Sequence, residues 1–540
     1  MASLNFLNRE QLPLGAKITR NVLYSGVRLF LLAPLPFLLI PFFLKHLGTS
    51  GYGTWAVFLA ISGLTSVADV GLVTTLSKHV AEFYALKDLR SLSRFLNTGF
   101  VLYLAIAGLL AGILGLGLPL LLRTLFRTSS VPASELRLLW RYLIMLVFAN
   151  TMNLLLTSII TGMQRMDLTT CIGSMNLLLA AGLSVLLLKW SLGLRGILYA
   201  YTIAAWLTSL VYIYVVHRLL PEIKLDVASC RWAVAREILS FSTKTYVTQV
   251  AVVIQNQIEK IYLAQFVGVA SAAWYDIASE LALKLRGIPS LILAPLMPAA
   301  SELHALADRT RLAHLYCRAH KYLAFIGVPL VVYVVFVSRS FVQLWAGPDL
   351  KLIATPLSIL LIVNFINLTT GPGFLTLVGG GKLRPGLYSA LLGIVLNLTL
   401  SLFLIRAYGF EGAVTGTALS MAIASIFFLY LFRRATDGSY PNVIRVAYSK
   451  PVLCSLLTIG FLWTVTRFER PSWGTLVIEG VAFSATYLVL LLLVRFFDSF
   501  DLNILERFLH MPRIARRFIP DAELGGPLLP DSQSAQTRIG

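Results

Sequence analysis

Long apolar stretches, separated by short polar ones, run through most of the 540 residues. A helix needs about 20 apolar residues to cross about 30 Å of hydrocarbon, and about fourteen windows reach or approach that length. They lie at roughly 22–44, 54–77, 97–122, 140–162, 168–188, 196–216, 245–266, 273–297, 322–343, 352–377, 385–405, 412–432, 451–466 and 474–494. The strands of a membrane barrel would alternate apolar and polar residues instead. The pattern therefore predicts an all-α, polytopic membrane protein with about 14 transmembrane helices.

Composition and charge exclude several classes of function. Hydrophobic residues make up 57% of the chain and charged residues 13%, so little sequence remains for a soluble catalytic domain. In a soluble protein, the net charge of +20 would suggest binding to nucleic acid. In a membrane protein, such an excess of Lys and Arg is expected because it accumulates in the cytoplasmic loops. The sequence contains no ATP-binding or metalloprotease motif, and its four cysteines lack metal-ligand spacing. We expect no enzymatic activity, no metal site and no nucleic-acid partner.

The distribution of Lys and Arg predicts the orientation. With the N-terminus in the cytoplasm, the inner segments hold 29 of these residues and the outer loops hold 12. Because cytoplasmic loops carry the excess of positive charge, both termini are expected inside. The polar N-terminus is too weakly apolar for a cleaved signal peptide, and the last residues, rich in Pro, Gly, Ser and Gln, are typical of disorder.

The chain also contains an internal repeat. Gly48 precedes an aromatic residue by seven positions, and so does Gly268, 220 residues later. The stretch SLGLRGILYAYTIA around Gly193 matches AYGFEGAVTGTALS around Gly409 at an offset of 216. Six helices lie on each side of a polar link, so the two halves have the same orientation. They should be related by an axis along the membrane normal, as in many transporters.

These boundaries predict five parts. Two six-helix lobes would surround a central cavity, and two further helices and a tail would follow them. The parts are an N-terminal lobe at 1–216, a cytoplasmic link at 217–244, a C-terminal lobe at 245–435, helices 13 and 14 at 436–496, and a partly disordered tail at 497–540.

Ionisable residues within the spans are the candidates for function, because each one is costly in hydrocarbon. Arg28 lies in the first helix and Asp69 in the second, at similar predicted depths. Either Arg28 binds a phosphate or diphosphate while Asp69 holds it or receives a coupling cation, or Arg28 extends its charge toward the membrane surface and the two residues are only structural, as an ion pair.

The seventh and eighth helices carry more polar groups. Gln249, Asn256 and Lys260 form one stripe of the seventh helix, beside Glu259, and such a stripe cannot face lipid. On the eighth helix, Asp276 and Glu280 precede Lys284 at intervals of four residues. These acidic groups either couple a cation or form structural ion pairs, and the order of Glu280 and Lys284 favours a pair that neutralises itself.

At this point the sequence resembles a known family. The stretch LGTSGYGTWAVFLAISGLTSVADVGLVTTLSKHVAEF resembles the second-helix signature of polysaccharide-type flippases, which belong to the multidrug/oligosaccharidyl-lipid/polysaccharide exporter superfamily. The segments NQIEKIYLAQFVGVASAAWYDIASEL, LMPAASEL and YGFEGAVTGTALS also fit, and the resemblance covers about residues 15–435. It implies the O-antigen and exopolysaccharide transporter branch, located in the bacterial cytoplasmic membrane.

The resemblance also implies a function. Such a flippase moves a lipid-linked oligosaccharide, typically on undecaprenyl diphosphate, from the inner to the outer leaflet by alternating access. By that analogy Arg28 and Lys260 would bind the diphosphate, with Asn256 and Gln249 on the same stripe as Lys260. Membrane lipids and a glycan polymerase or ligase are the expected partners. We expect no cofactor, although protons or sodium could drive transport.

Two alternatives stay open. The first is a cation-coupled multidrug antiporter of the same superfamily, which Asp69, Glu259 and Asp276 would serve. The first helix has Arg28 instead of the carboxylate common in that branch, which disfavours this alternative. The second is an inactive membrane assembly or scaffold protein, which a dry interior with every polar group paired would favour.

Overall fold

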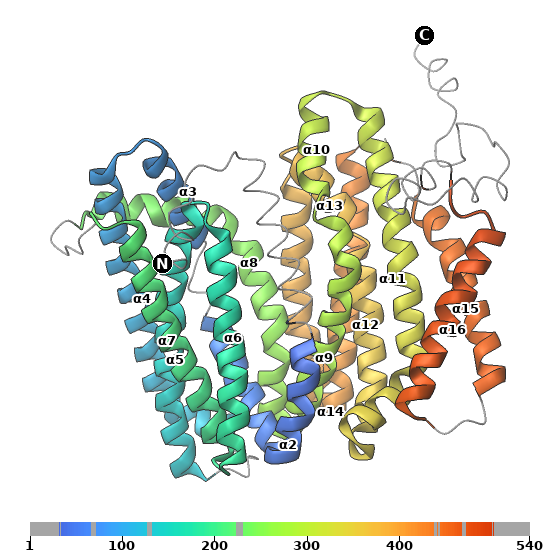
Figure 1. The fold of residues 1–540 in the computed structure, drawn as a ribbon, viewed down its shortest axis with the longest axis horizontal. Helices are drawn as coiled ribbons and strands as arrows, with labels where there is room; N and C mark the ends of the chain where they lie inside the picture. The colour runs from blue at the N-terminus through green and yellow to red at the C-terminus, as the bar shows by residue number, and fades with distance from the viewer. Residues whose placement is uncertain are drawn as a thin grey trace, which may run out of the picture. The chain divides into compact units, whose positions relative to one another are not determined.

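The computed structural model describes residues 32, 34–65, 72–126, 132–222, 230–436, 440, 443–466, 471–498 and 501. These residues form helices and no strand, which confirms the all-α prediction (Figure 1). The α-helices are α2 (Pro34–Thr65), α3 (Leu72–Ala85), α4 (Leu89–Thr124), α5 (Ala133–Gly162), α6 (Met166–Lys189), α7 (Gly193–Leu219), α8 (Trp232–Phe266), α9 (Val269–Ser290), α10 (Leu296–Ala305), α11 (Arg309–Ala346), α12 (Ala354–Leu368), α13 (Gly371–Gly379), α14 (Arg384–Ala435), α15 (Val443–Thr466) and α16 (Trp473–Leu493). Two short 3₁₀ helices, η3 (Leu291–Leu293) and η4 (Pro348–Ile353), connect some of them.

The helices are long enough to cross a membrane. Within the described residues, ten segments are sufficiently long and apolar for this. One of them is α14, whose 52 residues contain two of the expected spans joined at a kink at Gly409. Similarly, α2 is broken at Gly48, where the backbone leaves the helical conformation. The protein is therefore a multi-pass helical membrane protein.

The chain divides into two compact units. Unit 1 comprises the residues up to Ile277 and the segment Ile394–Gly416, and unit 2 comprises Ala278–Gly393 and the residues from Thr417 onward. The helices α9 and α14 therefore contribute residues to both. This division follows compactness and not the sequence repeat, so the lobe boundaries expected at residues 216 and 435 stay predictions.

The backbone itself repeats. Of the eleven described residues with a positive φ, eight fall into four pairs that lie 216 to 220 positions apart. These pairs are Gly48 and Gly268, Lys87 and Ala307, Gln164 and Gly381, and Gly193 and Gly409. Because left-handed residues end or redirect helices, the chain turns at corresponding positions in both halves of the sequence.

Helix capping repeats in the same way. Asp88 precedes α4, and its carboxylate accepts a hydrogen bond from the backbone N–H of Ser91 at 3.0 Å. Asp308, 220 residues later, precedes α11 and accepts from the N–H of Arg311 at 2.9 Å. Each aspartate thus satisfies a backbone donor that the first turn of its helix leaves unpaired. The bond from Ser91 also lowers the pKa of Asp88 below its ordinary value.

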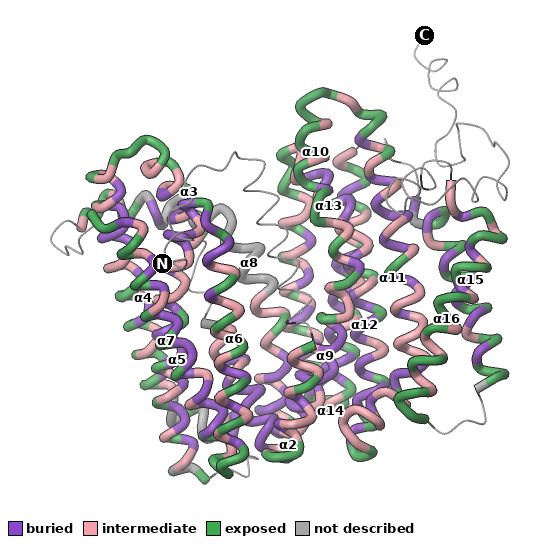
Figure 2. The backbone as a smooth tube through the Cα atoms, viewed as in Figure 1, coloured by how far each residue is buried: buried purple, intermediate pink, exposed green. Residues whose placement is uncertain are grey.

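The helices α15 and α16 belong to unit 2. Only three residues of α16 are buried, namely Phe483, Tyr487 and Leu491, which recur every four positions and form one stripe. Figure 2 shows that much of the rest of both helices is exposed, as expected of surfaces that face lipid. Tyr487 and Leu491 of this stripe, and residues just after α16, pack with Phe325 of α11.

Ion pairs hold the segment after α16 against α11. Arg318 lies 2.8 Å from a carboxylate oxygen of Asp498 and 2.9 Å from one of Asp501. Lys321, one turn further along α11, pairs with both aspartates as well. Burial would raise the pKa of Asp498, but Arg318 and Lys321 outweigh it and lower that pKa to about 2.

Candidate functional site

Several of the residues predicted from the sequence cannot be placed. Arg28 and Asp69 lie outside the described residues. Gln249 lies on α8 at a position whose side chain is not described, and Asn256, seven residues later, is exposed. The roles proposed for these four residues therefore stay predictions.

Lys260 forms a buried ion pair within unit 1. Its Nζ lies 2.6 Å from Oδ1 of Asp276, and the two side chains are only 10% and 8% exposed. The hydroxyl of Tyr52 on α2 donates to the other oxygen of Asp276 at 2.9 Å. The pair joins α8 to α9, so the charge of Lys260 is already neutralised by a carboxylate. This is the structural arrangement that the sequence left open as an alternative, and an anion would have to compete with Asp276 for the ammonium.

Glu259 lies next to Lys260 in a different environment. Its side chain is fully buried, and Oε1 accepts a hydrogen bond from the amide of Asn397 on α14 at 2.5 Å. The hydroxyl of Ser401, one turn beyond Asn397, is buried and has no hydrogen-bond partner within the described residues. A carboxyl group, an amide and a hydroxyl are oxygen ligands that suit a hard cation, and a buried carboxyl group can also hold a proton.

Glu280 and Lys284 form a separate pair on the part of α9 that belongs to unit 2. Their charged groups are 3.0 Å apart, and the side chains are 36% and 42% exposed. The four-residue spacing places both on one helix face, in the order that stabilises a helix. The two charges neutralise each other, as the sequence indicated.

Arg286 is the cation for which the sequence gave no role. Its Nη1 donates to the side-chain oxygen of Asn364 at 3.0 Å, and its Nη2 donates to that of Asn367 at 2.9 Å. Within the part of the chain that the structure describes, no carboxylate pairs with this guanidinium. Its positive charge is therefore held in place by neutral amides, inside membrane-spanning helices of unit 2.

A repeated sequence motif positions these asparagines. Asn364 and Asn367 belong to the sequence NFINL on α12, and α5 of unit 1 carries NTMNL with Asn150 and Asn153. The spacing of three residues places the two asparagines of each motif on one helix face. This N-x-x-N-L repeat was the signal in the sequence that could have identified the site of Arg286.

The second asparagine of each motif has a corresponding partner. In unit 1, the hydroxyl of Ser209 donates to Asn153 at 2.8 Å, and Asn153 donates to a backbone carbonyl of α7 at 3.1 Å. In unit 2, Asn367 donates to the hydroxyl of Ser425 at 3.2 Å. Ser209 and Ser425 are 216 residues apart, within the offsets of the repeat.

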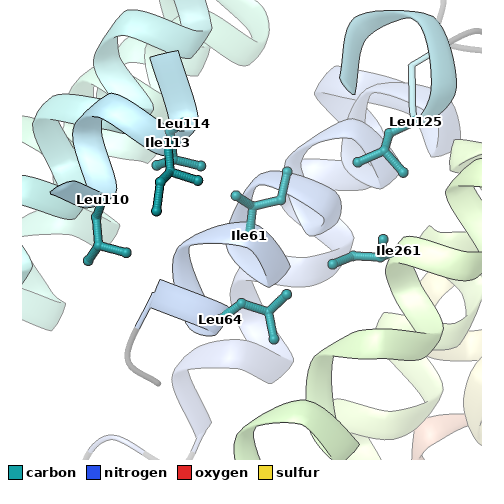
Figure 3. A pocket seen from close by; sticks show the side chains of 7 residues that line it. All are labelled: Ile61, Leu64, Leu110, Ile113, Leu114, Leu125 and Ile261. Carbon is teal, nitrogen blue, oxygen red and sulfur yellow. The ribbon is translucent and has the colours of Figure 1, made fainter. Parts of the chain in front are cut away.

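Unit 1 contains a pocket whose described lining residues are all apolar. Its volume is about 270 Å³, and Figure 3 shows leucine and isoleucine side chains that converge on it from α2, α4, α8 and the chain just after α4. Such a cavity offers no hydrogen bond, so it suits a hydrocarbon group and not a polar ligand. Among the described residues, no cluster of three His, Cys, Asp or Glu side chains could hold a metal ion.

Comparisons with known proteins agree with a helical membrane protein of the transporter type. The family model described as polysaccharide biosynthesis protein matches residues 18–304. A "Putative O-antigen transporter" of Shigella flexneri is 20% identical over 395 residues, which are 73% of this chain and 92% of that protein. The solved structure of the lipid II flippase MurJ, in an inward closed conformation, superposes with a TM-score of 0.70 at 17% identity, over 91% of this chain and 100% of MurJ.

A second solved structure is an inward-facing multidrug resistance transporter of the MATE family. It gives a TM-score of 0.58 at 15% identity, over 78% of this chain and 98% of that transporter. At such identities a likeness establishes the fold alone. The fold is that of the superfamily to which the resemblance pointed.

Proposed function

Because the chain belongs to the polysaccharide biosynthesis protein family, a family of membrane transporters, we propose that it is a flippase for a lipid-linked oligosaccharide. In this proposal the glycan is attached to a polyprenyl diphosphate and moves from the cytoplasmic to the outer leaflet by alternating access. The matches to an O-antigen transporter and to a lipid II flippase support this substrate class. The glycan then serves polysaccharide synthesis on the far side of the membrane.

The observation that best supports the proposal is that Arg286 lies within a membrane-spanning segment and has no carboxylate partner among the described residues. A charge in hydrocarbon is costly, and a buried charge without a counter-charge is more costly still. Two amide oxygens orient the guanidinium but leave its net charge in place. An arginine has five N–H donors, so donors remain for a second ligand. A phosphate group supplies both the missing negative charge and paired oxygen acceptors in the matching geometry.

The location and partners complete the proposal. We expect the bacterial cytoplasmic membrane with both termini inside, because the basic residues favour the inner segments. Glycan polymerase or ligase proteins are the expected neighbours, since they would consume the exported glycan. Reporter fusions at residues 217–244 and after residue 500 test the orientation, and a periplasmic signal at either position would contradict it.

The test of the function is complementation of a strain that lacks the gene. Arg286→Ala should abolish glycan export while the protein inserts at the level of the unchanged chain. Arg286→Lys should restore part of the export, because the charge survives and the two-pronged geometry does not. The measurement is the lipid-linked glycan that accumulates on the cytoplasmic side. Full export by Arg286→Ala would remove the basis of the proposal.

Glu259 is the group we propose for coupling to protons or sodium. The support is its complete burial and its hydrogen bond from the amide of Asn397. Glu259→Gln keeps the shape and the hydrogen bonding but cannot ionise. We expect export by this variant to lose its response to an imposed proton or sodium gradient. A response equal to that of the unchanged chain would show that Glu259 does not couple.

The multidrug antiporter remains the second candidate. Its support is the same buried carboxyl group and the MATE-like fold. The two functions are distinguished by the deletion strain, since an antiporter predicts increased drug sensitivity and normal glycan export. A scaffold protein is disfavoured because Arg286 has no counter-charge within the described residues, whereas a dry structural core would pair it.

A further inference from the structure

Unit 1 contains a polar pocket among α2 and the membrane-spanning helices α5, α6 and α7. Its volume is about 330 Å³, near the lower end of the range of about 300–1,000 Å³ for small-ligand sites. The groups able to form hydrogen bonds in its lining are the side chains of Asn150, Asn176, Ser62 and Tyr201, and the remaining lining residues are apolar or glycine. Among the described residues, no charged side chain lines it.

The pocket lies in the middle of its helices. Asn150 is twelve residues from the end of α5, and Asn176 is ten residues from the start of α6. At 1.5 Å per residue, these positions are about 18 Å and about 15 Å from the helix ends. Amide groups at this depth lie far from the polar headgroups, so they need hydrogen-bond partners within the protein or its pocket.

The asparagines of the pocket have no such partner. Within the described residues, neither Asn150 nor Asn176 forms a hydrogen bond, and both side chains retain exposed surface. Asn153, three residues from Asn150 on α5, shows the contrast, since it bonds to the hydroxyl of Ser209 and to a carbonyl of α7. Asn153, which packs α5 against α7, therefore has hydrogen-bond partners, whereas Asn150 and Asn176, which line the pocket, have none within the described residues.

We propose that this pocket binds one uncharged sugar ring of the lipid-linked glycan. The inference rests on the proposed function and names the part of unit 1 that recognises the glycan. Each amide offers donors and an acceptor, which match the hydroxyl and acetamido groups of a sugar. The ring of Tyr201, packed against Trp55 at 4.7 Å, and the leucines of the lining suit its apolar face. The described lining residues carry no charge, which distinguishes this pocket from the phosphate site proposed at Arg286.

The neighbouring apolar pocket supports the assignment by contrast. It has a similar volume, about 270 Å³, but only leucine and isoleucine line it (Figure 3). Ile61 lines the apolar pocket and Ser62, the next residue of α2, lines the polar one. Two cavities of comparable size in one unit therefore differ in chemistry, and only one of them can satisfy hydroxyl groups.

The experiment compares two lipids on the full chain in nanodiscs. One probe is the lipid-linked glycan that accumulates in the strain lacking the gene, and the other is undecaprenyl diphosphate without sugar. We expect the unchanged chain to bind the first about tenfold more tightly, which is about 1.4 kcal/mol. The double variant Asn150→Leu and Asn176→Leu should lose this preference and keep its affinity for the lipid without sugar. Asn176→Leu alone serves if the double variant does not fold.

The matched control is Ser174→Ala on α6. Its hydroxyl bonds to a carbonyl of its own helix at 2.7 Å and does not line the pocket, so the preference should survive. A preference that also survives in the pocket variants would overturn the inference. So would equal binding of both lipids by the unchanged chain, which leaves the proposed function intact. Binding of neither lipid by the unchanged chain would instead contradict the proposed function, and the pocket inference with it.

Discussion

The two units use the same N-x-x-N-L motif in different ways. In unit 2, both asparagines of the motif, Asn364 and Asn367, hold the guanidinium of Arg286. In unit 1, the first asparagine of the motif has no partner within the described residues and lines a polar pocket. The second asparagine bonds to a serine on a later helix in both units. The repeat thus keeps the contact between the second asparagine and a serine, and varies the surroundings of the first asparagine.

The units also treat their intramembrane cations differently. Lys260 in unit 1 is neutralised by Asp276 at 2.6 Å, whereas Arg286 in unit 2 contacts two amides and, within the described residues, no carboxylate. A cation with a carboxylate partner stabilises the fold as a pair, and a cation with neutral partners keeps its charge for a ligand. This difference is the basis of the proposed division, in which Lys260 stabilises the fold and Arg286 binds an anion, and each of the following predictions tests part of it.

The largest effect on stability is expected from breaking the ion pair between Lys260 and Asp276 in unit 1. Lys260→Ala removes the ammonium that lies 2.6 Å from the buried carboxylate of Asp276, and loss of one partner of a buried pair should lower the free energy of unfolding by about 3–5 kcal/mol. The double variant Lys260→Met and Asp276→Leu removes both charges and should recover most of that loss. The measurement is thermal or denaturant unfolding of the purified protein. If Lys260→Ala is stable but inactive in export, Lys260 binds the substrate, as the sequence alone suggested.

The next largest effect is expected at the second asparagine of each motif, Asn367 in unit 2 and Asn153 in unit 1. Asn367→Ala removes a hydrogen bond to a charged group, for which about 1.5–3 kcal/mol is typical. It should reduce export as well as stability, because Arg286 loses half of its support. Asn153→Ala removes neutral hydrogen bonds and should cost about 1 kcal/mol for each, with export per folded molecule unchanged. Equal loss of export per folded molecule in both variants would break the functional distinction between the two motifs.

The sequence predicted the helical fold and the pair of Glu280 and Lys284 on one helix, but not how polar groups on different helices pair. Apolar length alone predicts membrane helices, because hydrocarbon leaves no alternative for the backbone. The spacing of Glu280 and Lys284 predicted their pair, since neighbours on one helix are fixed by its geometry. Asp276 and Lys260 lie on different helices, so only tertiary packing could show that they meet.

Arg286 shows most clearly what could not be predicted from the sequence. The sequence shows an arginine inside a span, but its partners come from a helix about 80 residues later. Whether such a residue is neutralised depends on which groups that helix presents, and hydropathy contains no such information. The glycines of the repeat were recognisable because a left-handed backbone restricts the residue type. An asparagine carries no comparable restriction, so its motif was overlooked.

The smallest effect is expected at the end of unit 2, where carboxylates pair with cations outside the spans. Asp498 is 38% exposed beside Arg318 and Lys321, so Asp498→Asn at neutral pH should cost at most about 1 kcal/mol. Because the pKa of Asp498 falls from 3.8 to about 2 on folding, the stabilisation is complete above about pH 5 and is lost as the pH falls through 2.

This last effect is measured by unfolding the unchanged chain and the Asp498→Asn variant between pH 7 and pH 2. Their difference in stability should shrink toward zero at the acidic end, since protonation removes the same charge as the substitution. A difference that stays constant with pH would mean that Asp498 acts through packing or hydrogen bonding instead of its charge. A difference at neutral pH as large as that for Lys260→Ala would contradict the comparison itself, because it would show that exposure does not determine what a lost partner costs.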